Sequence, residues 1–527
     1  MGALPTTEIL QQFPSRSPVR LAPAPRKAAA LPLGTILVVM LGNFLGPLYS
    51  SVANVAIPNL TSAFGSDVDT MEWVVTGYML GFSISMPVAG WLSDTFGRRN
   101  IYLLGIAMFT LFSILLTCAW DTTSLIAFRV MQAVGGGLVS PTGMAIITDV
   151  VPPKMRGRAL GLWGMGMMLA PAFGPWIAGI IINANDEWRP IFLLGVPFGI
   201  AGFIASWIVL PKSENRRASV AAFDFVGFAT ISIALVAFLV PLTQGNRVGW
   251  DEPWIAESFA LAAIAFGLFI WRELTAAAPM LDLSLFRDRA FAVATILRGV
   301  LGANYYFALF LLPLFTQDIL GWTPDLSGLI LVPGGVLMAL LMPISGTFAD
   351  RIGARALVFA GMVLAAIGTF AFARIDLDWE LSRLTIVNLL RSGAMGLLFT
   401  TLTAAALTSV PKNRAGSASA IVNTVWQVSG SLAIAIGQTY LSSRIWLRQS
   451  EVAAGAVLNR PAVEPALQHL HEIVTQHGMQ PSSALVMLAH MYGQAAAVQA
   501  YGDTFLLATI FTAVAIPLAL LLRPQKG

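Results

Sequence analysis

The residues Gly90-Trp-Leu-Ser-Asp-Thr-Phe-Gly-Arg-Arg99 form a short polar segment between two long apolar runs. Each run has roughly twenty residues, the length that an α-helix needs to cross the hydrocarbon core of a bilayer. Gly90 and Gly97 allow close approach and tight turning of the backbone. Asp94 only accepts hydrogen bonds, whereas Arg98 and Arg99 only donate them, so the segment is suited to fasten neighbouring helix ends together. The same residues also fit an ordinary polar loop whose arginines anchor it on the cytoplasmic side.

The composition is that of a polytopic membrane protein. Of the 527 residues, 56% are hydrophobic and 11% are charged, and the mean hydropathy is +0.75. Soluble domains carry about 25% charged residues, so a water-soluble fold is excluded. The net charge of +4 fits basic cytoplasmic loops and does not indicate a nucleic-acid partner. A single cysteine, Cys118, permits neither an intrachain disulfide nor a cysteine metal cluster. We expect no metal and no cofactor.

Apolar runs of membrane-spanning length recur about fourteen times along the chain. They lie at about 33–55, 72–92, 100–119, 123–148, 158–183, 190–210, 225–243, 255–272, 291–316, 326–349, 354–373, 384–408, 416–441 and 499–522. Before them, residues 1–31 are rich in Pro, Ala and Arg, which predicts a disordered cytoplasmic tail. A cleaved signal peptide is not favoured, because the first apolar run is too long.

Charges alternate between successive loops, as the positive-inside rule requires. Basic residues cluster near 98–99, 154–158, 212–217, 272–289, 351–355, 412–414 and 523–526. Acidic residues dominate the loops between them, near 67–69, 121, 186–187, 251–252 and 318–325. The pattern predicts an even number of helices with both termini in the cytoplasm.

The chain also repeats itself. The stretch from Gly346 to Arg355, which contains Asp350, restates the segment from Gly90 to Arg99 at an offset of 256 residues. Arg391 stands in the same relation to Arg129 at an offset of 262. We therefore predict an all-α membrane protein with two six-helix bundles in parallel orientation. Their expected bounds are 32–211 and 276–527, with an inserted helix pair at 212–275.

The segment that opens at Gly90 resembles the cytoplasmic signature loop of the major facilitator superfamily, with Arg99 in its last place. Further along, the stretch from Leu125 to Gly137 resembles a fourth-helix motif of that superfamily, and Ala170–Gly179 resembles its antiporter motif. The stretch from Trp188 to Gly199 and the long segment before the last span are similar to fourteen-helix drug:proton antiporters of the EmrB branch. The motif residues implied by these matches are Gly90, Asp94, Gly97, Arg98, Arg99, Arg129, Gln132, Pro171, Gly174, Pro175, Gly179 and Asp350.

The resemblance implies a transporter of the bacterial inner membrane that exports amphipathic organic compounds by alternating access, coupled to a proton or potential gradient. It also implies a periplasmic adaptor and an outer-membrane channel as partners. The alternatives are an exporter specific for anionic amphiphiles such as fatty acids, and an uptake transporter of the same superfamily. A membrane enzyme lacks support, since no nucleophile–base pair, metal spacing or phosphate loop is found. A receptor or scaffold that transports nothing is the remaining alternative.

The first helix departs from the family pattern. Tyr49 stands where the family has an aspartate, and the sequence places no other carboxylate deep within a span. A tyrosine has a reference pKa near 10, so it does not exchange protons at neutral pH as a carboxylate can. Asp503, near the outer side, is an alternative proton carrier.

Arg129 and Arg298 lie inside predicted spans, where a charge is expensive and usually faces protein or a wet cavity. Arg129 is interpreted either as a structural hydrogen-bond hub or as part of a proton relay. Arg298 either extends towards the cytoplasmic surface or binds an anionic head group in a central cavity. The residues expected to line that cavity are Tyr49, Asn54, Trp163, Met165, Met168, Arg298, Asn304, Tyr305, Tyr306, Phe310 and Trp426.

The segment 442–498 is expected to be a long extracytoplasmic loop that contains all four histidines. Val463, Leu467, Leu470 and Val474 recur at helical spacing, which predicts an amphipathic helix whose apolar stripe docks the adaptor or packs on the protein's own outer face. A second helix is expected to begin near Ser482. The histidines share no clean helix face, so we interpret them as solvated surface residues.

Overall fold

The computed structural model describes residues 32–522 apart from 153–154, 186, 213–222, 277–278, 409, 412–413, 459, 477–479 and 481. The predicted tail, 1–31, lies outside the described residues, as do His477 and the last five residues. Within the described part, fourteen helices are long and apolar enough to cross a membrane, so the predicted number is confirmed. The first of them is longer than expected, because it continues to Phe64 and ends only where Gly65 takes a left-handed φ of 56°.

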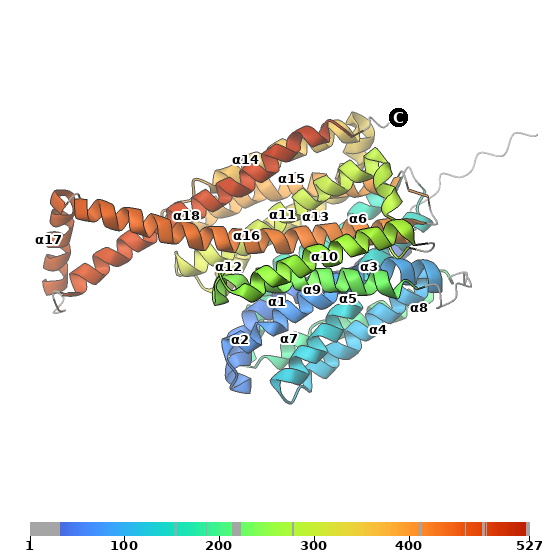
Figure 1. Ribbon diagram of the computed structural model, residues 1–527, viewed down its shortest axis with the longest axis horizontal. Helices are drawn as coiled ribbons and strands as arrows, with labels where there is room; N and C mark the ends of the chain where they lie inside the picture. Colours follow the sequence, from blue (N-terminus) through green and yellow to red (C-terminus); the bar gives the residue numbers. More distant parts are fainter. Residues whose placement is uncertain are drawn as a thin grey trace, which may run out of the picture. The chain divides into compact units, whose positions relative to one another are not determined.

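Six long helices form the N-terminal bundle and six form the C-terminal bundle (Figure 1). The N-terminal bundle holds α1 (Leu33–Phe64), α3 (Trp73–Phe96), α4 (Arg98–Thr117), α5 (Thr122–Val150), α6 (Arg156–Asn185) and α8 (Val196–Val209), with short α2 (Val68–Met71) and α7 (Arg189–Leu193). The C-terminal bundle holds α11 (Arg289–Asp318), α13 (Leu331–Ile352), α14 (Ala354–Phe372), α15 (Leu381–Thr408), α16 (Ala415–Leu458) and α18 (Ser482–Ala519), with short η4 (Leu283–Arg287), α12 (Pro324–Leu329) and α17 (Arg460–Gln476).

The two bundles pack their helices in the same way. In the first, α1 packs on α6, and α5 packs on both α3 and α4. In the second, α11 packs on α16, and α15 packs on both α13 and α14. These pairs correspond helix by helix, which confirms the internal repeat inferred from the offset of 256 residues.

The bundles contact each other through two equivalent helix crossings, α3 with α16 and α6 with α13. A Cβ on Gly90 of α3 would lie 3.0 Å from the carbonyl oxygen of Gly416 on α16. At the other crossing, a Cβ on Gly157 of α6 would lie 3.3 Å from Cα of Gly346 on α13. Because Gly346 repeats Gly90, the same motif glycine lets the helix backbones approach closely at both crossings.

Of the inserted pair, α9 (Phe225–Val248) packs on α3 and α16, and α10 (Pro253–Thr275) packs on α9. Leu239 and Leu242 of α9 form one apolar cluster with Leu80 of α3 and Ala435 of α16. Helix α9 therefore touches both bundles and covers their seam on this side. The outer face of α10 is exposed and apolar, as a lipid-facing helix requires.

The segment 442–498 contains the two helices that the sequence predicts there: α17 spans Arg460–Gln476, and α18 begins at Ser482 (Figure 1). The sequence did not predict that α16, which has 44 residues, continues to Leu458. At 1.5 Å per residue α16 is about 66 Å long, roughly twice the hydrocarbon thickness of a bilayer. Asp503 of α18 accepts hydrogen bonds from Arg448 of α16 at 2.8 and 3.1 Å and pairs with Arg444 at 3.0 Å. These ion pairs hold the two long helices together.

The apolar stripe of α17 packs within the chain. Leu470 and Val474 are buried in a cluster with Ala484 of α18, and Leu467 packs against it. The stripe therefore covers part of the protein's own α18 and is not a free docking surface. Among the histidines that the structure describes, His469 and His490 are exposed and His471 contacts the carbonyl oxygen of Leu467.

Replacing Gly161 by alanine should weaken the α6–α13 crossing. The added Cβ would lie 2.5 Å from the carbonyl oxygen of Met342 and 2.7 Å from Cα of Pro343, and backbone atoms cannot turn aside. We expect the variant to lose about 1–3 kcal/mol of stability, seen as a lower unfolding temperature in detergent.

The matched control is Gly267→Ala on α10, where a Cβ meets no heavy atom within 4 Å. It should keep the wild-type unfolding temperature or gain up to about 1 kcal/mol from helix propensity. Equal unfolding temperatures for the two variants would contradict the close crossing.

Candidate functional site

Asp94 lies near the end of α3 in a cluster of opposite charges. Arg98 donates to Asp94 Oδ1 at 3.0 Å and to the carbonyl oxygen of Ala145 at 2.9 Å, and it also pairs with Asp149 of α5. Between these residues Gly97 takes a φ of 90°, which separates α3 from α4 and favours glycine. We call Asp94, Arg98 and Asp149 the Asp94 cluster.

The Asp94 cluster joins the two bundles. The Asp94 carboxylate lies against the N-terminus of α16, because a Cβ built on Gly416, in the first turn of that helix, would collide with it. The N-terminus of a helix carries free N–H groups and a partial positive charge, so a carboxylate there is stabilising. Nothing in the sequence pointed directly to this helix end as the partner of Asp94.

Arg99 of the segment 90–99 makes its contacts within the N-terminal bundle, and the repeat of this segment, 346–355, is described in part. Arg99 donates to the carbonyl oxygen of Trp207 on α8 at 2.6 Å and lies 5.0 Å from the centre of that indole ring. The side chain of Asp350, the repeat of Asp94, is outside the described residues. The backbone of its neighbour Gly353 has a φ of 87°, which matches Gly97.

Arg129 is a fully buried hydrogen-bond hub of the first bundle. Its three guanidinium nitrogens donate to the carbonyl oxygens of Val74 and Tyr49, at 3.3 and 2.5 Å, and to Oε1 of Gln132, at 2.6 Å. Gln132 in turn donates to the hydroxyl of Ser113 at 2.7 Å. The network connects α1, α3, α4 and α5, so each nitrogen of the buried charge has a partner. This supports the structural interpretation of Arg129.

Arg391 is the hub of the second bundle. It donates to Oδ1 of Asn304 at 3.2 Å and to Oδ1 of Asn388 at 3.2 Å. Asn304 also donates to the hydroxyls of Thr369 and Thr512, at 3.0 and 2.7 Å. Asn304, expected to line a cavity, therefore serves this network. The repeat could have predicted this role for Asn304. Asn304 follows Tyr49 by 255 residues and Thr369 follows Ser113 by 256, and Tyr49 and Ser113 belong to the Arg129 network.

Tyr49 is fully buried and its hydroxyl is used within the first bundle. The hydroxyl donates to the carbonyl oxygen of Phe192 at 2.7 Å and accepts from the backbone N–H of Gly195 at 2.7 Å. It thereby connects α1 with α7 and α8. The hydroxyl thus both donates and accepts a hydrogen bond, as a carboxylate at this position could not.

Arg298 is completely buried and differs from both hubs. Its Nη1 donates to the carbonyl oxygen of Phe399 at 3.1 Å and to the hydroxyl of Thr403. The guanidinium lies 3.8 Å from the ring centre of Phe399 and 5.1 Å from that of Trp426. Tyr305 and Tyr306 pack on Trp426 with ring centres 5.7 and 6.0 Å away. Arg298 therefore does not extend to the surface, and one aromatic cluster surrounds it.

The remaining candidates are dispersed. Trp163 and Met168 are buried on α6. Met165 is half-buried on the same helix. Phe310 packs against the apolar core of the second bundle, and the side chain of Asn54 lies outside the described residues. Of the predicted cavity residues, the structure therefore brings together Arg298, Tyr305, Tyr306 and Trp426.

The antiporter-like stretch of α6 lies between the two bundles. Helix α6 continues through both Pro171 and Pro175. On one face, Gly174 leaves no room for a Cβ beside Ser51 of α1. On another face, Ala172 faces Gly335 of α13, and Gly179 lies near Asp325 of α12. The stretch therefore couples α1 of the first bundle with α12 and α13 of the second.

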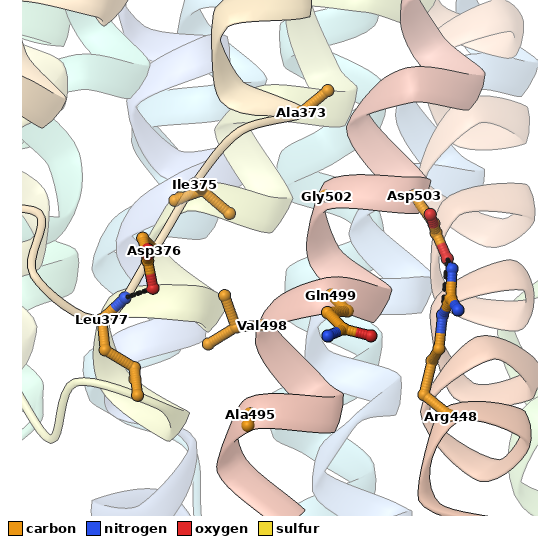
Figure 2. Close-up of a pocket in the computed structure, with 10 residues that line it drawn as sticks. All are labelled: Ala373, Ile375, Asp376, Leu377, Arg448, Ala495, Val498, Gln499, Gly502 and Asp503. Carbon is orange, nitrogen blue, oxygen red and sulfur yellow. Dashed lines mark hydrogen bonds and ion pairs between the residues drawn. The ribbon is translucent and has the colours of Figure 1, made fainter. Parts of the chain in front are cut away.

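A separate cavity of about 380 Å³ is lined by residues 373–377 between α14 and α15, by residues 495–503 of α18 and by Arg448 of α16 (Figure 2). Figure 2 shows Arg448 and Asp503 paired at one side of it and Asp376 at the other. Its charged groups are thus engaged with each other, apart from Asp376, whose carboxylate accepts from the backbone N–H of Leu377 at 2.8 Å. None of the residues that line this cavity belongs to the aromatic group around Arg298 (Phe399, Trp426, Tyr305 and Tyr306), which we call the Arg298 cluster.

Comparison with known proteins gives the same family at every level. The model of the Major Facilitator Superfamily matches residues 39–434. The multidrug export protein EmrB of Haemophilus influenzae is 30% identical over 472 residues, which cover 88% of this chain and 90% of that protein. The uncharacterized MFS-type transporter YhcA of Bacillus subtilis is 29% identical over 516 residues, or 96% of each chain. The solved structure of the proton:xylose symporter XylE has a TM-score of 0.56 and 14% identity over 92% of this chain and 96% of its own, which shows the shared fold.

Replacing Asp94 by asparagine should loosen the contact between the Asp94 cluster and α16. The variant keeps the size of the side chain but loses the charge that faces Arg98 and the N-terminus of α16. Such a charge contributes about 1 kcal/mol, so we expect a roughly fivefold shift towards separated bundles at this end. A cysteine at Ala420, buried beside Gly90, should then react faster with a water-soluble thiol reagent in a Cys118→Ser background.

The control is Asp121→Asn, because Asp121 caps α5 within one bundle by accepting from the backbone N–H of Ser124 at 2.7 Å. The same hydrogen bond and the Ser124 hydroxyl keep the pKa of Asp121 below its usual range. This variant should leave the reactivity at position 420 unchanged. Equal reactivity in wild type and Asp94→Asn would contradict the assigned role of Asp94.

Proposed function

This chain belongs to the Major Facilitator Superfamily, and from that premise we propose that it exports small amphipathic organic compounds across the bacterial inner membrane. The carrying observation is the pair of equivalent crossings between its bundles, α3 with α16 and α6 with α13. Two bundles that touch through matched small residues can rock about a central site and expose it to each side in turn. The proposal takes the direction of transport from the relatives named as multidrug export proteins.

The Asp94 cluster and the antiporter-like stretch fit the two steps of such a cycle. Asp94 contacts the first turn of α16 at one end of the bundles. The stretch around Gly174 and Gly179 packs on both bundles towards the other end. Alternate breaking of these two sets of contacts would open the central site first to one side and then to the other.

Proton coupling is the weakest part of the family analogy for this chain. Tyr49 occupies the position of the family aspartate, and its hydroxyl is held by Phe192 and Gly195. We propose that the membrane potential contributes to the driving force, because an anionic substrate is expelled by an inside-negative potential at about 2.3 kcal/mol per charge per 100 mV. An uptake transporter of the same fold, and an exporter restricted to anionic amphiphiles, are the competing functions.

The decisive experiment is transport in proteoliposomes loaded with ethidium, with a neutral amphiphile or with an anionic one, under an imposed pH gradient or an imposed potential. We expect efflux of amphiphiles, and for anionic ones a response to potential alone. Tyr49→Phe should keep transport but lose stability, because the Gly195 N–H loses its acceptor at a cost of about 1–3 kcal/mol. Strict dependence on the pH gradient with an inactive Tyr49→Phe would overturn the coupling, and net accumulation would identify an uptake transporter.

We further propose that α17 lies in the periplasm, that both termini are cytoplasmic, and that a periplasmic adaptor binds the exposed face of α18. Leu485, Val486 and Met491 on that face are 61%, 67% and 56% exposed, on the part of α18 that exceeds the length needed to span the bilayer.

A cysteine at His471 should react with an impermeant reagent in cells with a permeable outer membrane, whereas one at Arg355 should not. A photo-reactive residue at Val486 should cross-link a periplasmic protein, and one at the lipid-facing Leu261 should not. Labelling of both cysteines would refute the orientation.

A further inference from the structure

We infer that Arg298 is an anion-binding residue of the transport pathway and that it takes the carboxylate of an amphipathic organic acid. This inference rests on the proposed function, because it names the substrate class of the same central site. It starts from an incomplete set of hydrogen bonds. Nε and Nη2 of Arg298 are buried and have no hydrogen-bond partner among the described residues.

The comparison with the other two buried arginines shows that this is unusual within the chain. All three nitrogens of Arg129 have acceptors, and both terminal nitrogens of Arg391 do. The described part of the chain offers Arg298 no carboxylate within ion-pairing distance. A buried charge left without a counter-charge is strongly unfavourable, so the working cycle should supply one.

The free nitrogens have the arrangement that recognises a carboxylate. Nε and Nη2 lie on the same edge of the planar guanidinium, and two parallel N–H groups on one edge match two carboxylate oxygens. Nη1 is held by Phe399 and Thr403, which fixes the plane of the group. The ring faces of Phe399 and Trp426 beside it offer apolar contact to the body of the acid.

The Arg298 cluster lies directly behind the surface where the two bundles meet. A Cβ on Gly164 of α6 would lie 2.9 Å from the ring of Phe399. Asn423, one turn before Trp426 on α16, approaches the sulfur of Met144 on α5 at 3.6 Å. Both contacts cross from one bundle to the other, so separation of the bundles would expose the cluster to the central pathway.

The test measures calorimetric binding of decanoate and of decanamide, which has the same chain without the charge, to the full-length protein in a neutral detergent. Arg298→Gln should weaken decanoate binding roughly tenfold or more and leave decanamide binding unchanged. Arg298→Lys should lie between, because it keeps the charge but loses the paired N–H edge. The control is Arg383→Gln, an exposed arginine that lies 4.4 Å from the ring centre of Trp379 outside the cluster.

Wild-type decanoate affinity in Arg298→Gln would overturn the inference, and so would an equal loss of both ligands. Binding of phosphatidylglycerol that Arg298→Gln weakens, with no binding of free decanoate, would assign the arginine to a lipid head group. This outcome would also overturn the inference. Transport of neutral and cationic compounds without any decanoate binding would refute this inference alone and leave the proposed function standing. Charge-selective binding by a protein that transports nothing would instead refute the proposed function.

Discussion

The close approach of two motif glycines to two glycines of the opposite bundle is the constraint on which the rest of this structure depends. Gly90 meets Gly416, and Gly346 meets Gly157, at crossings that the repeat makes equivalent. Lipid provides no hydrophobic force between helices, so their association depends on tight packing and on hydrogen bonds. Glycine gives the close backbone contact, and Asp94 places a carboxylate against the N-terminus of α16 at the same place.

Inside each bundle the opposite requirement holds, because a body that rocks as a unit must not come apart. Arg129 and Arg391 meet it by joining at least three helices each through hydrogen bonds in a medium that offers no water. Neither hub bonds the other bundle in the described structure. Bundles that are held together internally in this way can move as units in the proposed alternating access.

Much of the fold could be predicted from the sequence, because span length, charge alternation and the offset of 256 residues depend only on the order of residue types along the chain. Those signals gave fourteen helices and two parallel bundles, and the structure has both. They did not predict that α16 continues as a helix to Leu458, beyond the bilayer. Hydropathy marks where a helix leaves the membrane and carries no information about where the helix ends. The partners of Tyr49, Asn304 and Asp94 were also missed, because hydrogen bonds between distant helices depend on rotation about each helix axis.

Two buried residues of this chain have one electrostatic consequence. In the first bundle, the hydroxyl of Tyr49 is bound to backbone groups, so this side chain adds no negative charge to the interior. The second bundle buries Arg298, whose Nε and Nη2 lack an acceptor among the described residues. No described carboxylate near Arg298 balances its charge, and an anionic substrate would complete both the charge and the hydrogen bonds. The uncharged Tyr49 and the unpaired edge of Arg298 therefore favour the same substrate charge.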